Sequence, residues 1–289
     1  MQKLLLWFCV LLLAKVNAQT NSLLYQISGN GLRDTSYLFG TMHTADARVL
    51  DKATRALPHF NKCKTYAMEL DPNETLDMSL ITQLMMGKGY SIKNMLPENE
   101  YLFLDSLMYD QIGMPALLFD NVAPIVLMSI IEAASLGLSD SGSTATEPLD
   151  FYLGKLAEKN KQKVVGIETV EEQLLALNSL TYTEQADLLL REINSIQKNE
   201  TQGDEVLALY LSENLDELLR LNNADPMPPK FYDALITQRN KRMADRIGAL
   251  MKNGSVFVAI GALHLPGIDG VLALLKKMGY TISPLNATK

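Results

Sequence analysis

The chain has 289 residues, of which 47% are hydrophobic and 20% are charged, and its formal net charge is −7 at pH 7. This composition is that of an ordinary globular protein, and the length suffices to bury a sizeable core. The acidic balance excludes the basic surface on which nucleic-acid binding depends, so we expect no nucleic-acid partner.

The N-terminal segment has the pattern of a cleavable signal peptide. Lys3 precedes the apolar run LLLWFCVLLLA, and the segment ends at Ala18, with Val16 at the third position before the expected cut. The apolar run is too short to span a membrane. We therefore expect residues 1–18 to be removed, leaving residues 19–289 without a stable membrane span and in a secreted or periplasmic location.

Apolar, β-prone runs open the mature chain. LLYQIS and SYLFGT flank a Gly-Asn-Gly turn and predict a hairpin or a strand pair, and TYAMEL predicts a further strand. A long helical stretch follows, in which apolar residues recur every three to four positions. Its last part, from Ala123 to Leu138, is apolar enough to suggest a membrane, but it is short and contains Glu132, so we expect a buried helix.

The second half of the chain alternates short strands with longer helices. TATEPLDFYLGKLAEKNKQ predicts a capped helix that leads into the strand KVVGIE. Three helices follow, the third of which covers residues 204–221, and NNADPMPP predicts a linker. One long helix is then expected over residues 231–254, ending at Gly254. The chain closes with the strand SVFVAIG, the helix GIDGVLALLKKMG and the strand YTISPL.

These elements indicate the α/β fold class. Short strands that are apolar on both faces surround a helical middle, which is typical of a mostly parallel central sheet flanked by helices, here with a helix-rich middle segment. No linker separates the helical middle cleanly. We therefore expect a single domain over residues 19–289, in which the helical insert serves as a lid or forms a subdomain.

Two of the 3 histidines end the same pattern, G-x-x-H, directly after an apolar strand. YLFGTMH ends at His43 and FVAIGALH ends at His264. In open α/β sheets ligands bind beyond the carboxyl ends of the strands, and glycine allows the chain to turn sharply there. We expect two distant segments to bring one imidazole each to the same edge. His59 follows a proline and no strand, so we interpret it as structural.

Two glutamates end strands in the same way. Glu69 ends TYAMEL, and Glu168 ends KVVGIE. Two imidazoles with one or two carboxylates suit a first-row divalent metal ion. They equally suit a metal-free site in which a histidine activates water. Cys63, the single cysteine of the mature chain, has no histidine or basic cluster tied to it and is expected to be a packed free thiol.

Five segments together resemble the TraB/GumN family, which includes the Tiki-type proteases: GTMH, MELD, KVVGIETVEEQ, QRNKRMADRI and GALH. They occur in the family's order over nearly the whole mature chain. The resemblance implies a fold related to the EreA/ChaN group and a site built from His43, His264 and Glu69. For Tiki-type members it implies divalent-metal-dependent proteolysis. Arg239 and Asn240 match the family's Arg-Asn helix motif, and the family also includes pheromone-shutdown and haem-binding relatives.

Three functions stay open. The first is a metal-dependent hydrolase acting on a peptide or protein substrate, in which His43, Glu69 and His264 hold manganese, cobalt, zinc or iron, Glu168 is a fourth ligand or the base, and Arg239 steadies the developing oxyanion. The second is a metal-independent, esterase-like hydrolase in which a histidine is the base. The third is a non-catalytic protein that binds a peptide or haem.

The roles of Arg239 and Asn240 have two interpretations each. Arg239 either stabilises an oxyanion or holds a carboxylate in its fork, or it forms a structural ion pair. Asn240 is either a helper donor or a surface residue of its helix. The sequence has no H-E-x-x-H, no G-x-S-x-G and no P-loop, so the common zinc-protease, serine-hydrolase and nucleotide-binding signatures are absent.

Overall fold

The computed structural model describes residues 22–44, 46–71, 74, 77–135, 149–198 and 203–285. The expected signal peptide, residues 1–18, lies outside this part of the chain. Within the described part, every helix is too short or too polar to cross a membrane.

The described residues form one six-stranded sheet, in the order β4-β3-β5-β2-β1-β6. Neighbours from β4 to β2 pair in parallel, whereas β1 is antiparallel to both β2 and β6. This confirms the α/β class with a mostly parallel sheet. The strands are β1 (Leu24–Gly29), β2 (Ser36–Thr41), β3 (Thr65–Leu70), β4 (Lys163–Glu168), β5 (Val256–Gly261) and β6 (Tyr280–Pro284).

The first two strands form the hairpin that the sequence predicts. Leu24 lies opposite Phe39, and Gly29, Asn30 and Gly31 all adopt positive φ angles in the connection. Glycine and asparagine tolerate this left-handed conformation better than other residues, which is why the chain turns here. The hairpin places β1 as an antiparallel strand between β2 and the edge strand β6.

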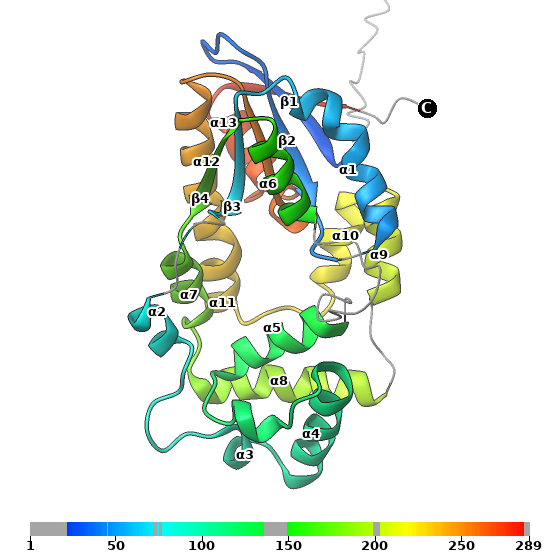
Figure 1. The fold of residues 1–289 in the computed structure, drawn as a ribbon, viewed down its shortest axis with the longest axis vertical. Coiled ribbons are helices and arrows are strands. Elements are labelled where there is room, and N and C mark those ends of the chain that lie inside the picture. The colour runs from blue at the N-terminus through cyan, green and yellow to red at the C-terminus, as the bar shows by residue number, and fades with distance from the viewer. Residues whose placement is uncertain are drawn as a thin grey trace, which may run out of the picture.

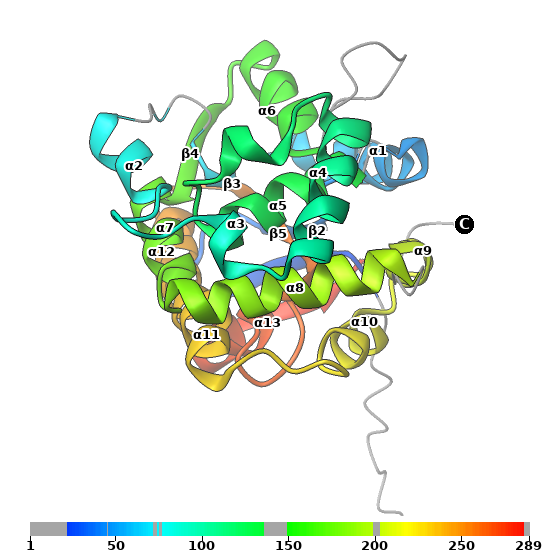
Figure 2. The same cartoon turned by 90° about the horizontal axis from the view of Figure 1, so that it is seen from below.

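Two pairs of helices cover the two faces of the sheet (Figures 1 and 2). Helices cover both faces there, which explains why β2 and β5 are buried along nearly their whole length rather than at alternate residues. One pair is α1 (Ala47–Phe60) with α6 (Leu149–Lys159), and the other is α12 (Gln238–Met251) with α13 (Val271–Lys277).

A helical layer lies beyond the carboxyl ends of the parallel strands (Figure 1). Helices α3, α4, α5 and α8 bury an apolar core of their own, separate from the core around the sheet. The helix-rich middle segment is thus packed as a unit that faces the edge of the sheet at which the site is expected. The elements of this region are α2 (Met78–Gln83), α3 (Ile92–Met95), α4 (Glu98–Ile112), η1 (Ala116–Phe119), α5 (Pro124–Ser135), α7 (Val170–Leu177) and α8 (Tyr182–Gln197).

The expected helix over residues 204–221 is wrong, because two helices occupy it. Helix α9 (Gly203–Leu211) and helix α10 (Leu215–Asn222) are separated at Glu213, whose φ is 61°. A tertiary interaction accompanies the break: the Glu213 carboxylate accepts from Leu23 N at 3.1 Å and from Lys52 Nζ at 2.8 Å. The amphipathic pattern continues across the break, so the sequence alone does not reveal it.

The long helix expected over residues 231–254 runs through three segments. Helix α11 (Pro229–Tyr232) continues into a π-helical turn, η2 (Asp233–Thr237), and then into α12. A π turn widens the helix by one residue and changes the direction in which the following side chains point. The first side chains after this turn include Arg239, so the turn helps to set the direction of its guanidinium.

Candidate active site at the carboxyl edge of the sheet

The two G-x-x-H turns lie side by side, because β2 and β5 are neighbours in the sheet. The parallel register places Thr41 opposite Gly261. A Cβ atom on Gly40 would lie 3.2 Å from the Cα of Ala262, which is closer than a side chain normally tolerates. Glycine in the first motif therefore lets the second motif pack directly against it.

His264 is buried, and its ring orientation is set by Asn240. The residue ends η3 (Ala262–His264) and is 7% exposed. Its Nδ1 lies 2.6 Å from Asn240 Oδ1, while Asn240 Nδ2 donates to the carbonyl of Asp269 at 2.8 Å. Since an amide oxygen only accepts, Nδ1 donates and Nε2 carries the lone pair. Burial lowers the pKa of His264, so this histidine is neutral at pH 7.

Glu69 faces the free nitrogen of His264. Its Oε1 lies 3.9 Å from His264 Nε2 and accepts from Gly261 N at 2.8 Å. Its Oε2 accepts from Arg239 Nη2 at 2.9 Å. Burial opposes ionisation of Glu69, but His264, Arg239, His43 and the Gly261 N–H together lower its pKa. Glu69 is therefore an ionised carboxylate at the centre of the cluster.

Arg239 joins the two strand-end glutamates. Its Nε and Nη2 lie 3.0 Å and 2.7 Å from Glu168 Oε2, and Glu168 is 0% exposed at its side chain. Gln173 Nε2 adds weaker contacts, at 3.3 Å to Glu69 and 3.4 Å to Glu168. One guanidinium therefore compensates two carboxylates, which is the geometry that the planar fork of arginine favours.

His43 lies at the border of this cluster and has a different partner. It follows β2 in the loop before α1, and its Nδ1 lies 2.7 Å from Asp150 Oδ2 in the first turn of α6. Its side chain is 58% exposed, against 11% for Asp150. The contact with Asp150 outweighs burial and raises the pKa of His43 to about 9, and Glu69 adds to this effect.

The structure thus brings four of the predicted residues into direct contact, namely Glu69, Glu168, Arg239 and His264. His43 interacts with that cluster through charge and contacts Asp150 instead. His59 stands apart, with its ring 4.7 Å from that of Tyr37.

Sequence reasoning missed Asp150 and Gln173. An acidic residue in the first turn of a helix is normally explained by the helix dipole, so Asp150 carried no other signal. Gln173 lies in KVVGIETVEEQ, five residues after Glu168, where one helical turn brings it back to the strand end. For Asn240, the structure excludes the surface interpretation, because the residue is 0% exposed.

The donor set has the chemistry of a divalent-metal site, although it is not assembled as one. Both histidines have Nδ1 engaged by a side-chain oxygen, which is the usual arrangement behind a metal-binding Nε2. Glu69 supplies a carboxylate next to one of them. Among the described residues, however, no three His, Cys, Asp or Glu side chains converge closely enough to form a metal-binding group. The types of these residues therefore fit a metal ion, but the side chains do not lie close enough together to bind one.

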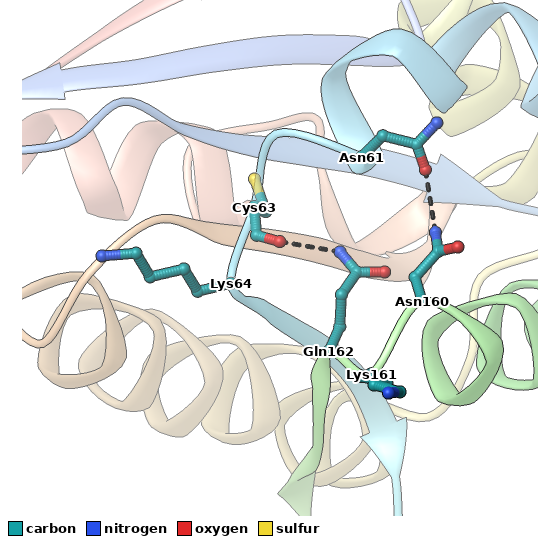
Figure 3. Close-up of a pocket in the computed structure, with 6 residues that line it drawn as sticks. All are labelled: Asn61, Cys63, Lys64, Asn160, Lys161 and Gln162. Carbon is teal, nitrogen blue, oxygen red and sulfur yellow. Dashed lines mark hydrogen bonds between the residues drawn. The ribbon is translucent and has the colours of Figure 1, made fainter.

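An open pocket lies at the opposite edge of the sheet, where β3 and β4 begin (Figure 3). Asn160 Nδ2 donates to Asn61 Oδ1 at 2.9 Å, and Gln162 Nε2 donates to the carbonyl of Cys63 at 2.8 Å. Burial raises the pKa of the Cys63 thiol to about 12. Cys63 is thus the buried free thiol that the sequence predicts, and this pocket contains none of the predicted site residues.

Comparisons with known proteins find relatives that are named as metalloproteases. The chain is 27% identical to Metalloprotease TIKI2 of Danio rerio, over 91% of this chain and 60% of that protein. It is 28% identical to Metalloprotease TIKI2 of Xenopus tropicalis, over 93% and 61%, and 27% identical to Metalloprotease TIKI1 of Homo sapiens, over 92% and 62%. The chain therefore spans about three fifths of the length of these relatives.

No solved structure is significantly similar to the chain. The model of the TraB/PrgY/gumN family, in contrast, matches residues 23–284, which include every strand and both G-x-x-H turns. The chain belongs to the TraB/PrgY/gumN family.

Proposed function

We propose that this protein is a divalent-metal-dependent peptidase whose reacting groups are His43, Glu69 and His264. One observation carries the proposal: in both histidines Nδ1 lies within 2.7 Å of a side-chain oxygen, and Nε2 has no hydrogen-bond partner among the described residues. Two oriented imidazoles near one ionised carboxylate are suited to hydrolysis. The relatives named as metalloproteases support the same class of reaction.

His43, Glu69 and His264 would hold the metal ion, for which manganese, cobalt, zinc and iron are the candidates. The ion would supply a Lewis acid that activates water and polarises a peptide carbonyl. A ligand imidazole has to be deprotonated, and Asp150 raises the pKa of His43 to about 9. We therefore expect metal affinity to increase with pH in the neutral range.

The other residues of the cluster orient and balance the reacting groups. Arg239 compensates Glu69 and Glu168, which would otherwise repel each other at the ends of adjacent strands. Glu168 has both oxygens occupied by Arg239 and no exposure at its side chain, so we assign it to holding Arg239 rather than to proton transfer. Asn240 fixes the tautomer of His264, which leaves Nε2 able to accept a proton or a metal ion.

The substrate is proposed to be a peptide or a protein, as the names of the relatives indicate for those proteins. We propose that the protein is exported, because residues 1–18 have the pattern of a signal peptide. N-terminal sequencing of the protein from its native host tests this directly. A mature chain that still begins at Met1 would contradict export through a cleaved signal.

The decisive experiment measures cleavage of a quenched-fluorescent peptide library by the purified protein. Chelation should abolish cleavage, and one ion from a panel of manganese, cobalt, zinc and iron should restore it. His43→Ala and His264→Ala should each be inactive, whereas His59→Gln, the matched control, should cleave like the natural chain. Full activity in both alanine variants would exclude any hydrolase at this site.

Two further results would indicate a different function for this site. Cleavage that survives exhaustive chelation but not the loss of either histidine would indicate a metal-independent hydrolase with a histidine base. A Soret band on titration with haem, without any cleavage, would indicate a binding protein.

A further inference from the structure

Asp150 is a buried carboxylate in an unusual place. It lies in the first turn of α6 and is 7% exposed. Burial raises the pKa of Tyr66 and Tyr210, and the nearby Asp150 carboxylate adds to the rise in both. Helix α6, which contains Asp150, packs against β3 and β4. Among the described residues, the basic group within salt-bridge distance of Asp150 is His43.

A helix-terminal role does not account for this placement. Asp46 and Asp77, which cap α1 and α2, accept hydrogen bonds from the backbone N–H groups of their own helices and remain accessible to water. Asp150 instead contacts a ring from another segment. A buried carboxylate without a partner is costly, whereas one bonded to an imidazole is compensated. The position of Asp150 is therefore explained by His43 rather than by the helix dipole.

We propose that Asp150 is the positioning residue of His43: by accepting from Nδ1 it fixes the rotation of the ring and leaves Nε2 as the only atom that can meet water, a metal ion or substrate. The reacting role of His43 rests on the proposed function, but its orientation by Asp150 does not.

Asn240 performs the same task for His264, at 2.6 Å, from the opposite face of the sheet. In both G-x-x-H histidines Nδ1 thus lies within 2.7 Å of an oxygen from a covering helix, in an ion pair for His43 and in a hydrogen bond for His264. An oxygen acceptor on one ring nitrogen fixes the tautomer and orients the other nitrogen, and removing such a partner typically lowers metal affinity or activity about 10- to 100-fold. The orienting contact serves a metal ligand and a metal-free base alike.

The test uses NMR of the imidazole N–H groups in the purified, chelator-treated protein. The full chain has 3 histidines, so their signals can be assigned with three single His→Gln variants. The natural chain should show a slowly exchanging Nδ1–H signal from His43. Asp150→Ala should lose it, and Asp150→Asn, which keeps an oxygen acceptor, should retain it at a changed shift.

Asp204→Ala is the matched control, since Asp204 is an exposed acid in the first turn of α9. It removes a helix-terminal charge without touching a histidine and should leave the His43 signal unchanged. A folded Asp150→Ala variant with the His43 signal of the natural chain would overturn the proposal. Should that variant fail to fold by circular dichroism, an unchanged His43 shift in Asp150→Asn would overturn it equally.

Activity gives a second readout. If the protein cleaves peptides, Asp150→Ala should lower kcat about 10- to 100-fold with little change in KM, because the substrate still binds while His43 is no longer oriented; Asp150→Asn, which keeps an acceptor, should lose less. An unchanged kcat would contradict the positioning role. If no cleavage is found in the natural chain, the proposed function fails, but the NMR result still decides how His43 is held.

Discussion

The two G-x-x-H turns share a sequence pattern and a place in the sheet, yet their histidines have different surroundings. His264 is buried on a short helical turn and contacts a neutral amide, that of Asn240. His43 is 58% exposed in a loop and contacts a carboxylate, that of Asp150. As a result the pKa of His264 is lowered by burial, while that of His43 is raised to about 9.

The difference originates in the covering helices rather than in the motifs. Parallel pairing of β2 and β5 brings the two motifs to the same edge of the sheet, offset by one residue, with Thr41 opposite Gly261. The partners of the rings come from α12 on one face of the sheet and α6 on the other. A G-x-x-H motif therefore predicts where an imidazole lies, whereas its charge and orientation depend on the helix that covers it.

The largest effect is expected on the His264 side, where Arg239 compensates two buried carboxylates. Arg239→Met should remove the guanidinium that Glu69 and Glu168 share, leaving Glu168 the longer 3.9 Å contact with Arg242, and lower the free energy of unfolding by about 3–5 kcal/mol. Arg239→Lys keeps the charge but not the fork, so both stability and activity should fall less. Urea denaturation measures the stability of each variant.

Arg220→Met provides the control for that series, because Arg220 pairs with Glu217 at a side chain that is 66% exposed. Its stability should match that of the natural chain. Equal losses in Arg239→Met and Arg220→Met would mean that the glutamate cluster is not a buried charge network.

A smaller effect is expected from removing the amide partner of His264. Asn240→Ala leaves the Nδ1–H of His264 buried without an acceptor, which should cost about 1–3 kcal/mol of unfolding free energy. Peptide cleavage should fall as well, because the ring is no longer oriented. Asn61→Ala removes an amide pair at the exposed surface and should change neither quantity. The comparison breaks down if the two asparagine variants behave alike in urea denaturation and in the cleavage assay.

The contributions of the two histidines to the free energy of unfolding should change with pH in opposite directions. The pKa of His43 is higher in the folded chain, about 9, than its ordinary value of 6.5. Its stabilising contribution is therefore complete below pH 6.5 and is lost as the pH rises through 9. In chelator-treated protein, the difference in unfolding free energy between the natural chain and His43→Gln should shrink across this range.

His264 should show no such trend above pH 6.5, because its folded pKa is lowered. Its contribution should instead decrease as the pH falls below 6.5, where the unfolded chain binds the proton more readily. Parallel pH profiles for His43→Gln and His264→Gln would show that the two surroundings do not differ.

The smallest effect is expected at the third histidine. The ring of His59 lies 4.7 Å from that of Tyr37, at an interplanar angle of 51°. His59→Gln should therefore leave peptide cleavage and the NMR signals of the other two rings unchanged. A loss of activity in this variant would show that the site extends beyond the carboxyl edge of the sheet.

Local sequence alone determines much of this protein. Apolar, β-prone runs such as TYAMEL and KVVGIE predict strands at their observed positions, because β-branched and aromatic residues favour the extended backbone. Glycine before each histidine predicts the sharp turns after β2 and β5. The convergence of both turns on one edge follows from the parallel sheet, which brings the carboxyl ends of its strands together.

Only the tertiary structure decides the partners of these groups. Asp150 is an ordinary helix-terminal acid in the sequence, and its contact with His43 exists because α6 packs over β3 and β4. The break at Glu213 follows from its bonds to Leu23 and Lys52, which are distant in the chain. A local sequence pattern indicates the backbone conformation and the degree of burial that its segment prefers. The identity of a long-range partner depends on how whole helices dock, and no short segment contains that information.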